Sequence, residues 1–286
     1  MKIIDPHVHF FDLKKGNYHW LKSENPPFWP DKPIIQKNFN ENDMKLASPM
    51  ELAGFVHIEA GFNNEQPWQE IAWLESMNTM PFKSVASIDL TSSPQYFIKQ
   101  VSKLLTYSSI VGVRHILDDD AEQILSNKNT ATNLATLATN NLHFELQMPL
   151  ANLAAVSLLE KLLKNAPHLN VIINHCGTPK LTAKQNQAWF DGMGLLSEYP
   201  KVTIKCSGWE MFSRHYSNHQ LTRVIKACIA IFSMDRVMLA SNFPLLLFSC
   251  SYQELWQSYR VAFGLTSNEL EQLCYQNARR YYRFSD

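Results

Sequence analysis

The 286-residue sequence lacks most features that would point to a secreted, membrane-bound or nucleic-acid-binding protein. Its five cysteines form no C-x-x-C pair, so we expect buried small side chains and no disulfide framework. The 26 basic and 26 acidic residues cancel, which leaves no overall field to attract nucleic acid or an acidic membrane. No apolar run approaches the roughly 20 residues of a membrane span. The first residues lack the basic-then-apolar pattern of a secretory signal, so we expect a cytoplasmic protein.

The sequence also lacks the glycine-rich loops that follow a strand in nucleotide-binding sheets. It contains instead eight short strand-like runs at a rather even spacing. They are Ile3–Asp5, Gly54–Glu59, Lys83–Asp89, Val111–Ile116, His143–Met148, Asn170–His175, Lys201–Ser207 and Arg236–Asn242. Most of the gaps between them carry helical periodicity. Strands that alternate with helices form parallel βαβ units, and eight such units predict an α/β protein with a single (β/α)8 TIM-barrel domain over residues 1–286.

The expected helices show apolar residues on one stripe. The clearest stripe comprises Phe97, Ile98, Val101, Leu104 and Leu105, and the spacing recurs in residues 66–77, 152–163, 219–232 and 255–263. A C-terminal helix is expected over residues 267–282 with Ser267 as its N-cap.

The segment 14–37 contains several prolines, which preclude a regular helix. We expect an ordered N-terminal loop that covers the carboxyl end of the first strand. Trp20 and Trp29 are then candidate walls of a pocket, although a purely structural cover would use the same residues.

Two histidines close the first strand-like run. Residues i and i+2 of a strand share a face, so His7 and His9 can direct two imidazoles at one point. Such a pair can bind zinc or another divalent metal, or it can polarise a carbonyl group without a metal. A His-x-His pair alone is common at strand ends. It becomes evidence for a site here because several of the later strand-like runs also end in residues able to do chemistry.

Polar side chains recur at the carboxyl ends of the other runs, which is the end where a TIM barrel carries its active site. Burying so many unpaired polar groups would be costly, and a solvated cavity relieves that cost. The strand ends therefore predict a pocket for a small-molecule substrate. The candidate substrate-binding residues are Arg114, His57, Glu59, Glu145 and Trp20.

Five motifs occur in order along the chain: Asp5-Pro6-His7-Val8-His9-Phe10, Gly112-Val113-Arg114-His115, Asn174-His175-Cys176-Gly177-Thr178-Pro179-Lys180, Lys205-Cys206-Ser207-Gly208 and Ala240-Ser241-Asn242-Phe243-Pro244. This series resembles the amidohydrolase-related family of TIM-barrel hydrolases. It is most similar to the branch with sugar-lactone hydrolases and the pyrone-dicarboxylate lactonase, over essentially the whole chain. The first motif and the His-Cys-Gly-x-Pro motif are the most specific.

The resemblance implies that His7, His9 and His175 lie around the active site. Some members of the family bind a divalent metal at these positions, while lactonases of this branch can work without one. Arg114 matches an arginine that meets a substrate carboxylate or oxyanion, and a structural ion pair is the equal alternative. A general-base acid is expected at the end of the eighth strand.

The chain departs from that pattern at Asn242, which stands where the family has aspartate. An amide cannot accept the proton of an attacking water near pH 7, but it can position water or stabilise an oxyanion. The fifth strand supplies no metal-binding histidine, so a two-metal site is not expected. His7, His9 and His175 could still hold one zinc ion with an open position for water.

These observations predict a hydrolase that opens a small lactone of a sugar acid or related carboxylate, with His7, His9, His175 and Asn242 as catalytic residues. A metal-dependent decarboxylase of the same superfamily is the second hypothesis. A catalytically impaired barrel that only binds a ligand is the third, because the usual acid is missing.

Overall fold

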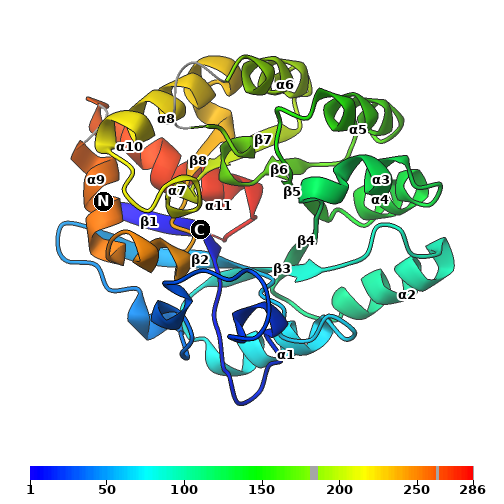
Figure 1. Cartoon of the computed structure of the whole chain (residues 1–286), viewed down its shortest axis with the longest axis horizontal. Helices are drawn as coiled ribbons and strands as arrows, with labels where there is room; N and C mark the ends of the chain where they lie inside the picture. Colours follow the sequence, from blue (N-terminus) through cyan, green and yellow to red (C-terminus); the bar gives the residue numbers. More distant parts are fainter. Residues whose placement is uncertain (181–185, 262–263, 286) are drawn as a thin grey trace.

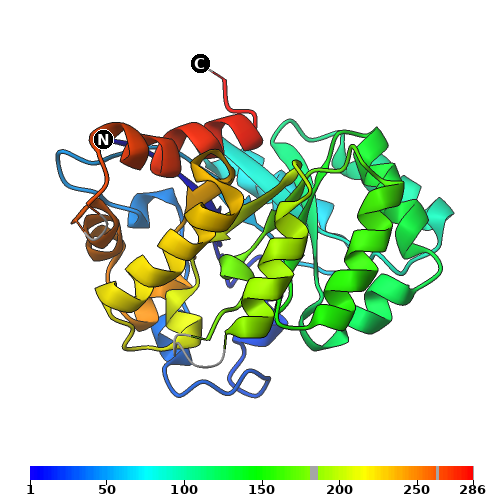
Figure 2. The same cartoon turned by 90° about the horizontal axis from the view of Figure 1, so that it is seen from above.

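The computed structural model describes residues 1–180, 186–261 and 264–285, and its centre is one sheet of eight parallel strands (Figure 1). Each strand pairs with the next along the chain. The strands are β1 (Lys2–Val8), β2 (Glu51–Ile58), β3 (Phe82–Ser87), β4 (Ile110–Ile116), β5 (His143–Gln147), β6 (Val171–Ile173), β7 (Val202–Cys206) and β8 (Val237–Leu239). The helices surround this ring (Figures 1 and 2), so the predicted (β/α)8 barrel is confirmed.

Contacts beyond the last strand close the ring. The backbone amide of Asn242 donates a hydrogen bond to the carbonyl of His7 at 3.0 Å. The backbone amide of His9 donates to the carbonyl of Phe243 at 2.7 Å. This closure places the His-x-His segment directly beside Asn242.

The principal helices are α1 (Trp68–Met77), α2 (Pro94–Leu104), α3 (Ala121–Ser126), α4 (Thr130–Thr139), α5 (Leu153–Asn165), α6 (Gln187–Ser197), α7 (Trp209–Phe212), α8 (Asn218–Phe232) and α9 (Tyr252–Val261). The helices predicted around residues 66–77, 152–163, 219–232 and 255–261 are confirmed. Ala262 and Phe263, the end of the last predicted stripe, lie outside the described residues. No helix in the described ranges is both long and apolar enough to cross a bilayer.

The apolar stripe of α2 is narrower than predicted. Phe97, Val101 and Leu104 are buried, whereas Ile98 and Leu105 are 49% and 42% exposed. A residue next to a buried helical position is rotated by about 100° from it, which turns these two side chains toward solvent.

The C-terminal helical segment comprises α10 (Ser267–Glu271), a π-helical turn (Gln272–Gln276) and α11 (Asn277–Tyr281). Its N-cap is Thr266, and the prediction of Ser267 is wrong by one residue. The Thr266 side chain accepts from the Glu269 amide while the Glu269 carboxylate accepts from the Thr266 amide, which forms a capping box. Ala278 and Tyr282 pack against interior residues of the strands, and the segment lies along one end of the barrel (Figure 2).

The N-terminal loop is ordered by a buried lysine. Lys32 is 3% exposed, and its ammonium group donates to three backbone carbonyls, those of Trp20, Lys22 and Asn25. Residues 14–37 contain only two single-turn helices, His19–Leu21 and Lys32–Ile34, so the predicted absence of a longer regular helix is confirmed. The lysine holds the loop over the pocket that is described below.

Two strands are shorter than predicted because the backbone turns left-handed at their carboxyl ends. β6 ends at Ile173 and β8 at Leu239. His175, Cys176 and Asn242 have φ values of 50°, 53° and 63°. Residues other than glycine are strained at positive φ values, and such strained residues are frequent at functional sites.

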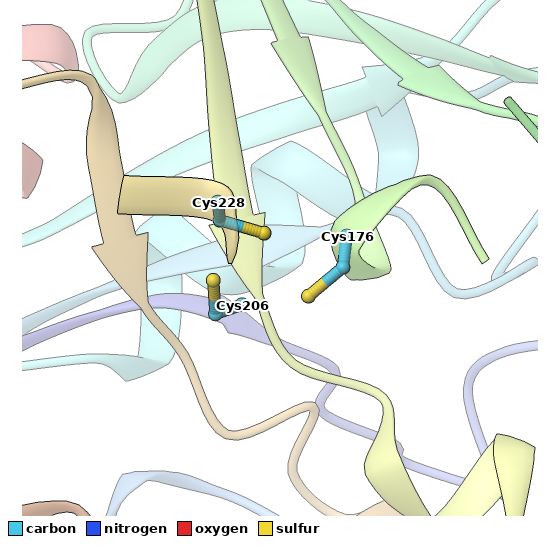
Figure 3. Close-up of side chains that lie close together, drawn as sticks. All are labelled: Cys176, Cys206 and Cys228. Atoms are coloured by element: carbon cyan, nitrogen blue, oxygen red, sulfur yellow. The ribbon is translucent and has the colours of Figure 1, made fainter. Parts of the chain in front are cut away.

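Three of the five cysteines meet between the barrel and its helices (Figure 3). Cys176 follows β6, Cys206 ends β7 and Cys228 lies in α8; their sulfur atoms lie within 4.8 Å of one another and all three residues are buried. Burial raises the pKa of the Cys176 and Cys206 thiols, and the described groups that affect these pKa values are thiols and backbone amides, not cations. A divalent metal held by three thiolates would leave a net negative charge in this apolar layer. Hydrogen bonds from the Cys176 and Cys206 thiols lower the pKa of Cys228 to about 5, so at most one of the three sulfurs is a thiolate. All five cysteines are unlinked, as the sequence predicted.

Candidate active site

A cavity of about 730 Å³ opens at the carboxyl ends of the strands, where TIM barrels carry their active sites. Its volume is in the range of small-molecule sites. Residues singled out in the sequence line it, among them His9, His175, Asn242, Arg114, Glu59 and Trp20. Trp29, Asp89, His115, Asp118, Gln147 and Phe212 also line it. The loop tryptophans thus reach the same pocket as the strand-end polar groups.

The three imidazoles of the sequence prediction are brought together. The ring centroid of His7 lies 5.0 Å from that of His9 and 4.5 Å from that of His175. The Nε2 atoms of His7 and His9 are 3.2 Å apart. His7 is fully buried behind the other two, so His9 and His175 are the imidazoles that face the cavity.

The hydrogen bonds around His7 and His9 fix a consistent set of protons. His9 Nδ1 lies 2.8 Å from the carbonyl oxygen of Ile58, so we assign the proton to Nδ1 and a lone pair to Nε2. Lys205 Nζ lies 3.4 Å from His7 Nδ1. Because an ammonium group only donates, His7 Nδ1 accepts, and the His7 proton lies on Nε2, where it points to His9 Nε2.

This arrangement does not fit a zinc ion held by His7, His9 and His175. A metal-bound imidazole normally donates its second N–H to an acceptor, whereas His7 turns its second nitrogen to the cation of Lys205. Within the described residues, the three cysteines are the group of three potential ligands whose donor atoms all lie within 4.8 Å, and the histidines do not meet that distance. The expected three-imidazole zinc site is not preformed.

All three imidazoles are held neutral. The pKa values of His7, His9 and His175 are lowered well below the usual 6.5, chiefly by burial. The positive charges of Lys205 and Arg114 lower them further. Neutral imidazoles can donate or accept hydrogen bonds at a reacting carbonyl group without carrying charge into the site.

Arg114 forms the structural ion pair that was one of the two alternatives left open by the sequence. Its guanidinium pairs with the Glu59 carboxylate, with Nη2 to Oε1 at 2.7 Å and Nε to Oε1 at 2.8 Å, and Nη1 donates to Gln147 at 2.9 Å. It also lines the cavity. Glu59 therefore neutralises the one arginine among the described residues of the pocket wall.

His57 and Glu145, which the sequence suggested as substrate-binding residues, lie outside the described wall of the cavity. His57 is fully buried and its Nε2 lies 2.9 Å from the Glu70 carboxylate. Glu145 is fully buried, pairs with Lys205 at 2.7 Å and accepts from the Tyr282 hydroxyl at 2.6 Å. Glu145 faces the barrel interior below the pocket, whereas His57 lies between the interior residues Val56 and Ile58 on β2 and faces helix α1.

Asn242 has an acidic partner that sequence reasoning missed. Glu210, in the short helix α7 after β7, is 1% exposed, and its Oε1 accepts from Asn242 Nδ2 at 2.5 Å. Burial raises the pKa of Glu210 to about 7. The sequence signal was an acid shortly after the seventh strand, but only the fold shows that it turns toward the eighth.

His175 is oriented by Ser207. The Ser207 hydroxyl lies 2.9 Å from His175 Nδ1. Gly208 permits this approach, because a Cβ at this position would lie 2.6 Å from His175 Nδ1, and its φ is +73°. The motif Lys205-Cys206-Ser207-Gly208 thus supports two of the three imidazoles.

Comparison with known proteins agrees with this fold and site. The amidohydrolase family (Amidohydro_2) matches residues 4–284. Uncharacterized protein y4mH of Sinorhizobium fredii is 26% identical over 296 residues, covering 98% of both chains. An amidohydrolase from Burkholderia multivorans with bound zinc has a TM-score of 0.81 at 18% identity, covering 100% of both chains. A putative 2-pyrone-4,6-dicarboxylic acid hydrolase from Pseudomonas putida has a TM-score of 0.71 at 17% identity, covering 99% of this chain and 98% of that one.

The structural neighbours are too distant in sequence to define more than the fold. The family match, however, runs from the first strand to the end of the C-terminal helix. It includes both the His-x-His of β1 and the polar ends of the later strands. The chain therefore belongs to the amidohydrolase family of TIM-barrel hydrolases.

Proposed function

We propose that this protein opens a small, uncharged lactone, such as the cyclic ester of a sugar acid, by attack of water on the carbonyl carbon. The observation that carries the proposal is that His9, His175 and Asn242 line one pocket of a hydrolase-family barrel. The reaction needs a donor for the carbonyl oxygen and an acceptor for the water, and the pocket offers both.

The donor is His175. If the Ser207 hydroxyl donates to Nδ1 of His175, the imidazole proton lies on Nε2. That N–H can bind the carbonyl oxygen and stabilise the negative charge that develops there during attack. The neutral imidazole suits this role, because the low pKa of His175 keeps the group uncharged at neutral pH.

The acceptor is the side-chain oxygen of Asn242. Asn242 Oδ1 is buried and has no hydrogen-bond partner among the described residues. A buried carbonyl without a partner is costly, and a water held there would satisfy it. We propose that this water is the nucleophile. As it attacks, His9 Nε2 gives up its hydrogen bond from His7 and takes the water's proton, which it then passes to the ring oxygen as the ester bond breaks.

The outer pocket favours an uncharged, hydroxyl-rich substrate. Its described wall carries the carboxylates Glu59, Asp89 and Asp118, and Glu59 already neutralises Arg114. A dicarboxylate would meet net negative charge there, whereas sugar hydroxyls can donate to these acceptors. The faces of Trp20 and Trp29 give the apolar side of a sugar ring a surface to pack on.

The substrate class is tested with a lactone panel at pH 7.5. We expect kcat/KM for neutral five- and six-membered sugar lactones to exceed that for a pyrone dicarboxylate by at least ~10-fold, the effect of about 1.4 kcal/mol. His9→Ala should lower the rate with the preferred lactone. Equal hydrolysis of every lactone by the wild type and His9→Ala would contradict the proposal.

Metal removal is a separate test. Because His7 faces Lys205, we expect the hydrolysis to proceed without a metal ion. Protein treated with a chelator and shown by elemental analysis to be metal-free should keep its kcat/KM within about 2-fold. Loss of activity that added zinc restores would show instead that the imidazoles rearrange around a metal.

The decarboxylase hypothesis remains the second candidate, because enzymes with this chemistry also use a His-x-His pair. It requires a carboxylate substrate, and the pocket's arginine is already paired with Glu59. The same assay separates the two, since decarboxylation releases carbon dioxide and lactone opening releases a proton at neutral pH.

A further inference from the structure

Glu210 and Asn242 leave two buried oxygens without a partner. Besides Asn242 Oδ1, the second carboxylate oxygen of Glu210, Oε2, has no hydrogen-bond partner among the described residues, although Glu210 is only 1% exposed. A buried carboxylate with a single side-chain partner is costly. Such a group in contact with a pocket residue needs a functional explanation.

We propose that Glu210 is a positioning residue whose carboxylate orients the Asn242 amide. This inference rests on the proposed hydrolysis, in which Asn242 Oδ1 binds the attacking water. Glu210 itself does not line the described pocket wall and acts through Asn242.

The orientation follows from hydrogen-bond chemistry. An amide presents a donor on one side and an acceptor on the other, whereas an ionised carboxylate only accepts. An ionised Glu210 must therefore face Asn242 Nδ2, as the 2.5 Å contact shows, which turns Oδ1 away from it. A protonated Glu210 can also donate, so it permits the reversed amide, whose NH2 group would face the water and repel its hydrogens.

The proposal predicts that activity increases as Glu210 ionises. Burial raises the pKa of Glu210 to about 7, so the change falls near neutral pH. Among the residues that the structure describes, three other titratable groups face Glu210. Arg214 lowers its pKa, while Tyr216 and Cys250 stay neutral near pH 7 because burial raises their own pKa values. Arg214 is itself paired with Asp31, with Nε to Oδ2 at 2.6 Å.

The decisive comparison uses three variants. Glu210→Gln removes the charge but keeps the shape, and we expect kcat/KM to fall about 10- to 100-fold and to lose its rise near pH 7. Asn242→Asp alone places two carboxylates in contact. They should share a proton, which shifts the rise of kcat/KM to higher pH. In the double variant the amide introduced at position 210 can donate to the carboxylate introduced at position 242, and activity should recover at least ~10-fold relative to Glu210→Gln.

Two results would overturn the proposal. One is a Glu210→Gln enzyme with the wild-type kcat/KM and pH profile. The other is a folded double variant no more active than Glu210→Gln. Thermal unfolding establishes that each variant is folded. If Glu210 had only a structural role, Glu210→Gln would lower the stability of the protein but keep the rise of kcat/KM near pH 7.

A measurement without substrate separates this inference from the proposed function. The side-chain NH2 signal of Asn242 in an ¹⁵N–¹H NMR spectrum is identified by its loss in Asn242→Asp. We expect it to shift with pH around 7 in the wild type and to stay constant in Glu210→Gln. If no lactone is hydrolysed, the proposed function fails, yet this shift still supports the coupled pair. A signal that does not change with pH overturns it.

Discussion

At the residue scale, Lys205 and Glu145 form an ion pair whose charges are costly to bury. Both side chains are fully buried and their charged atoms are 2.7 Å apart, inside the barrel and below His7. The Lys205 pKa is lowered to about 8, chiefly by burial, and Glu145 opposes that effect. Glu145 also contacts His143 and the Tyr282 hydroxyl, but Lys205 carries the neutralising charge, so removing one charge of the pair leaves the other buried without its counterion.

We predict that Lys205→Met destabilises the protein by about 3 to 5 kcal/mol at pH 7, because it leaves the Glu145 carboxylate buried without its cation. The double variant Lys205→Met with Glu145→Gln should lose clearly less than the sum of the two single variants. Urea unfolding measures all four proteins. Strictly additive losses would mean that the two charges do not depend on each other.

Glu210 also predicts a pH dependence of stability. Its pKa is about 7 in the folded protein against 4.5 for an ordinary glutamate, so its contribution to stability is complete below pH 4.5 and is lost as pH rises through 7. The amide in Glu210→Gln does not ionise, so this variant does not lose stability as pH rises through 7. We expect the variant to match the wild type near pH 4.5 and to exceed it by up to roughly 3 kcal/mol at pH 8. A constant difference between the two proteins across this range would contradict the raised pKa.

Two glycines of α6 make a matched test at the scale of one element. A Cβ at Gly192 would lie 2.1 Å from the backbone oxygen of Leu150, while a Cβ at Gly194 would meet no atom within 4 Å. Gly194→Ala should stabilise the protein by about 0.5 to 1 kcal/mol, because alanine favours a helix. Gly192→Ala should destabilise it by about 1 to 3 kcal/mol through the clash. Thermal unfolding of both variants checks the order, and a stabilising Gly192→Ala would contradict the close packing of α6.

The elements could be predicted from the sequence because their signals are local. Alternation and helical periodicity located all eight strands and most helices, and the closed parallel topology followed. The ends of β6 and β8 could not be predicted. His175 and Asn242 adopt positive φ values without a glycine to mark them, and no turn residue such as glycine or proline directly follows Ile173 or Leu239 to mark the end of the strand.

At the scale of the whole molecule, the sequence indicated several residues of the candidate site, but it misplaced His57 and Glu145 and did not show how the residues are paired. His7, His9 and His175 were expected to meet, and they do. The contacts that decide their chemistry, Lys205 with His7 and Glu210 with Asn242, join segments far apart in the chain. No local pattern encodes such distances.

We predict that the chain unfolds as one unit, as expected for a single TIM-barrel domain. The strands enclose an interior cluster that includes Tyr282 near the C-terminus and Ile4 near the N-terminus. Tryptophan fluorescence and far-ultraviolet circular dichroism should therefore report the same midpoint in urea. Two separated midpoints would indicate that part of the chain unfolds on its own.

The most direct test of the proposed hydrolysis is the rate of lactone opening by His175→Ala beside that of His168→Ala. His175 faces the pocket, whereas His168 is an exposed histidine before β6. With the preferred neutral lactone, we predict that kcat/KM falls about 100-fold or more in His175→Ala and stays at the wild-type value in His168→Ala. A His175→Ala enzyme that opens the lactone as fast as the wild type would contradict the assignment of this pocket as the site of hydrolysis.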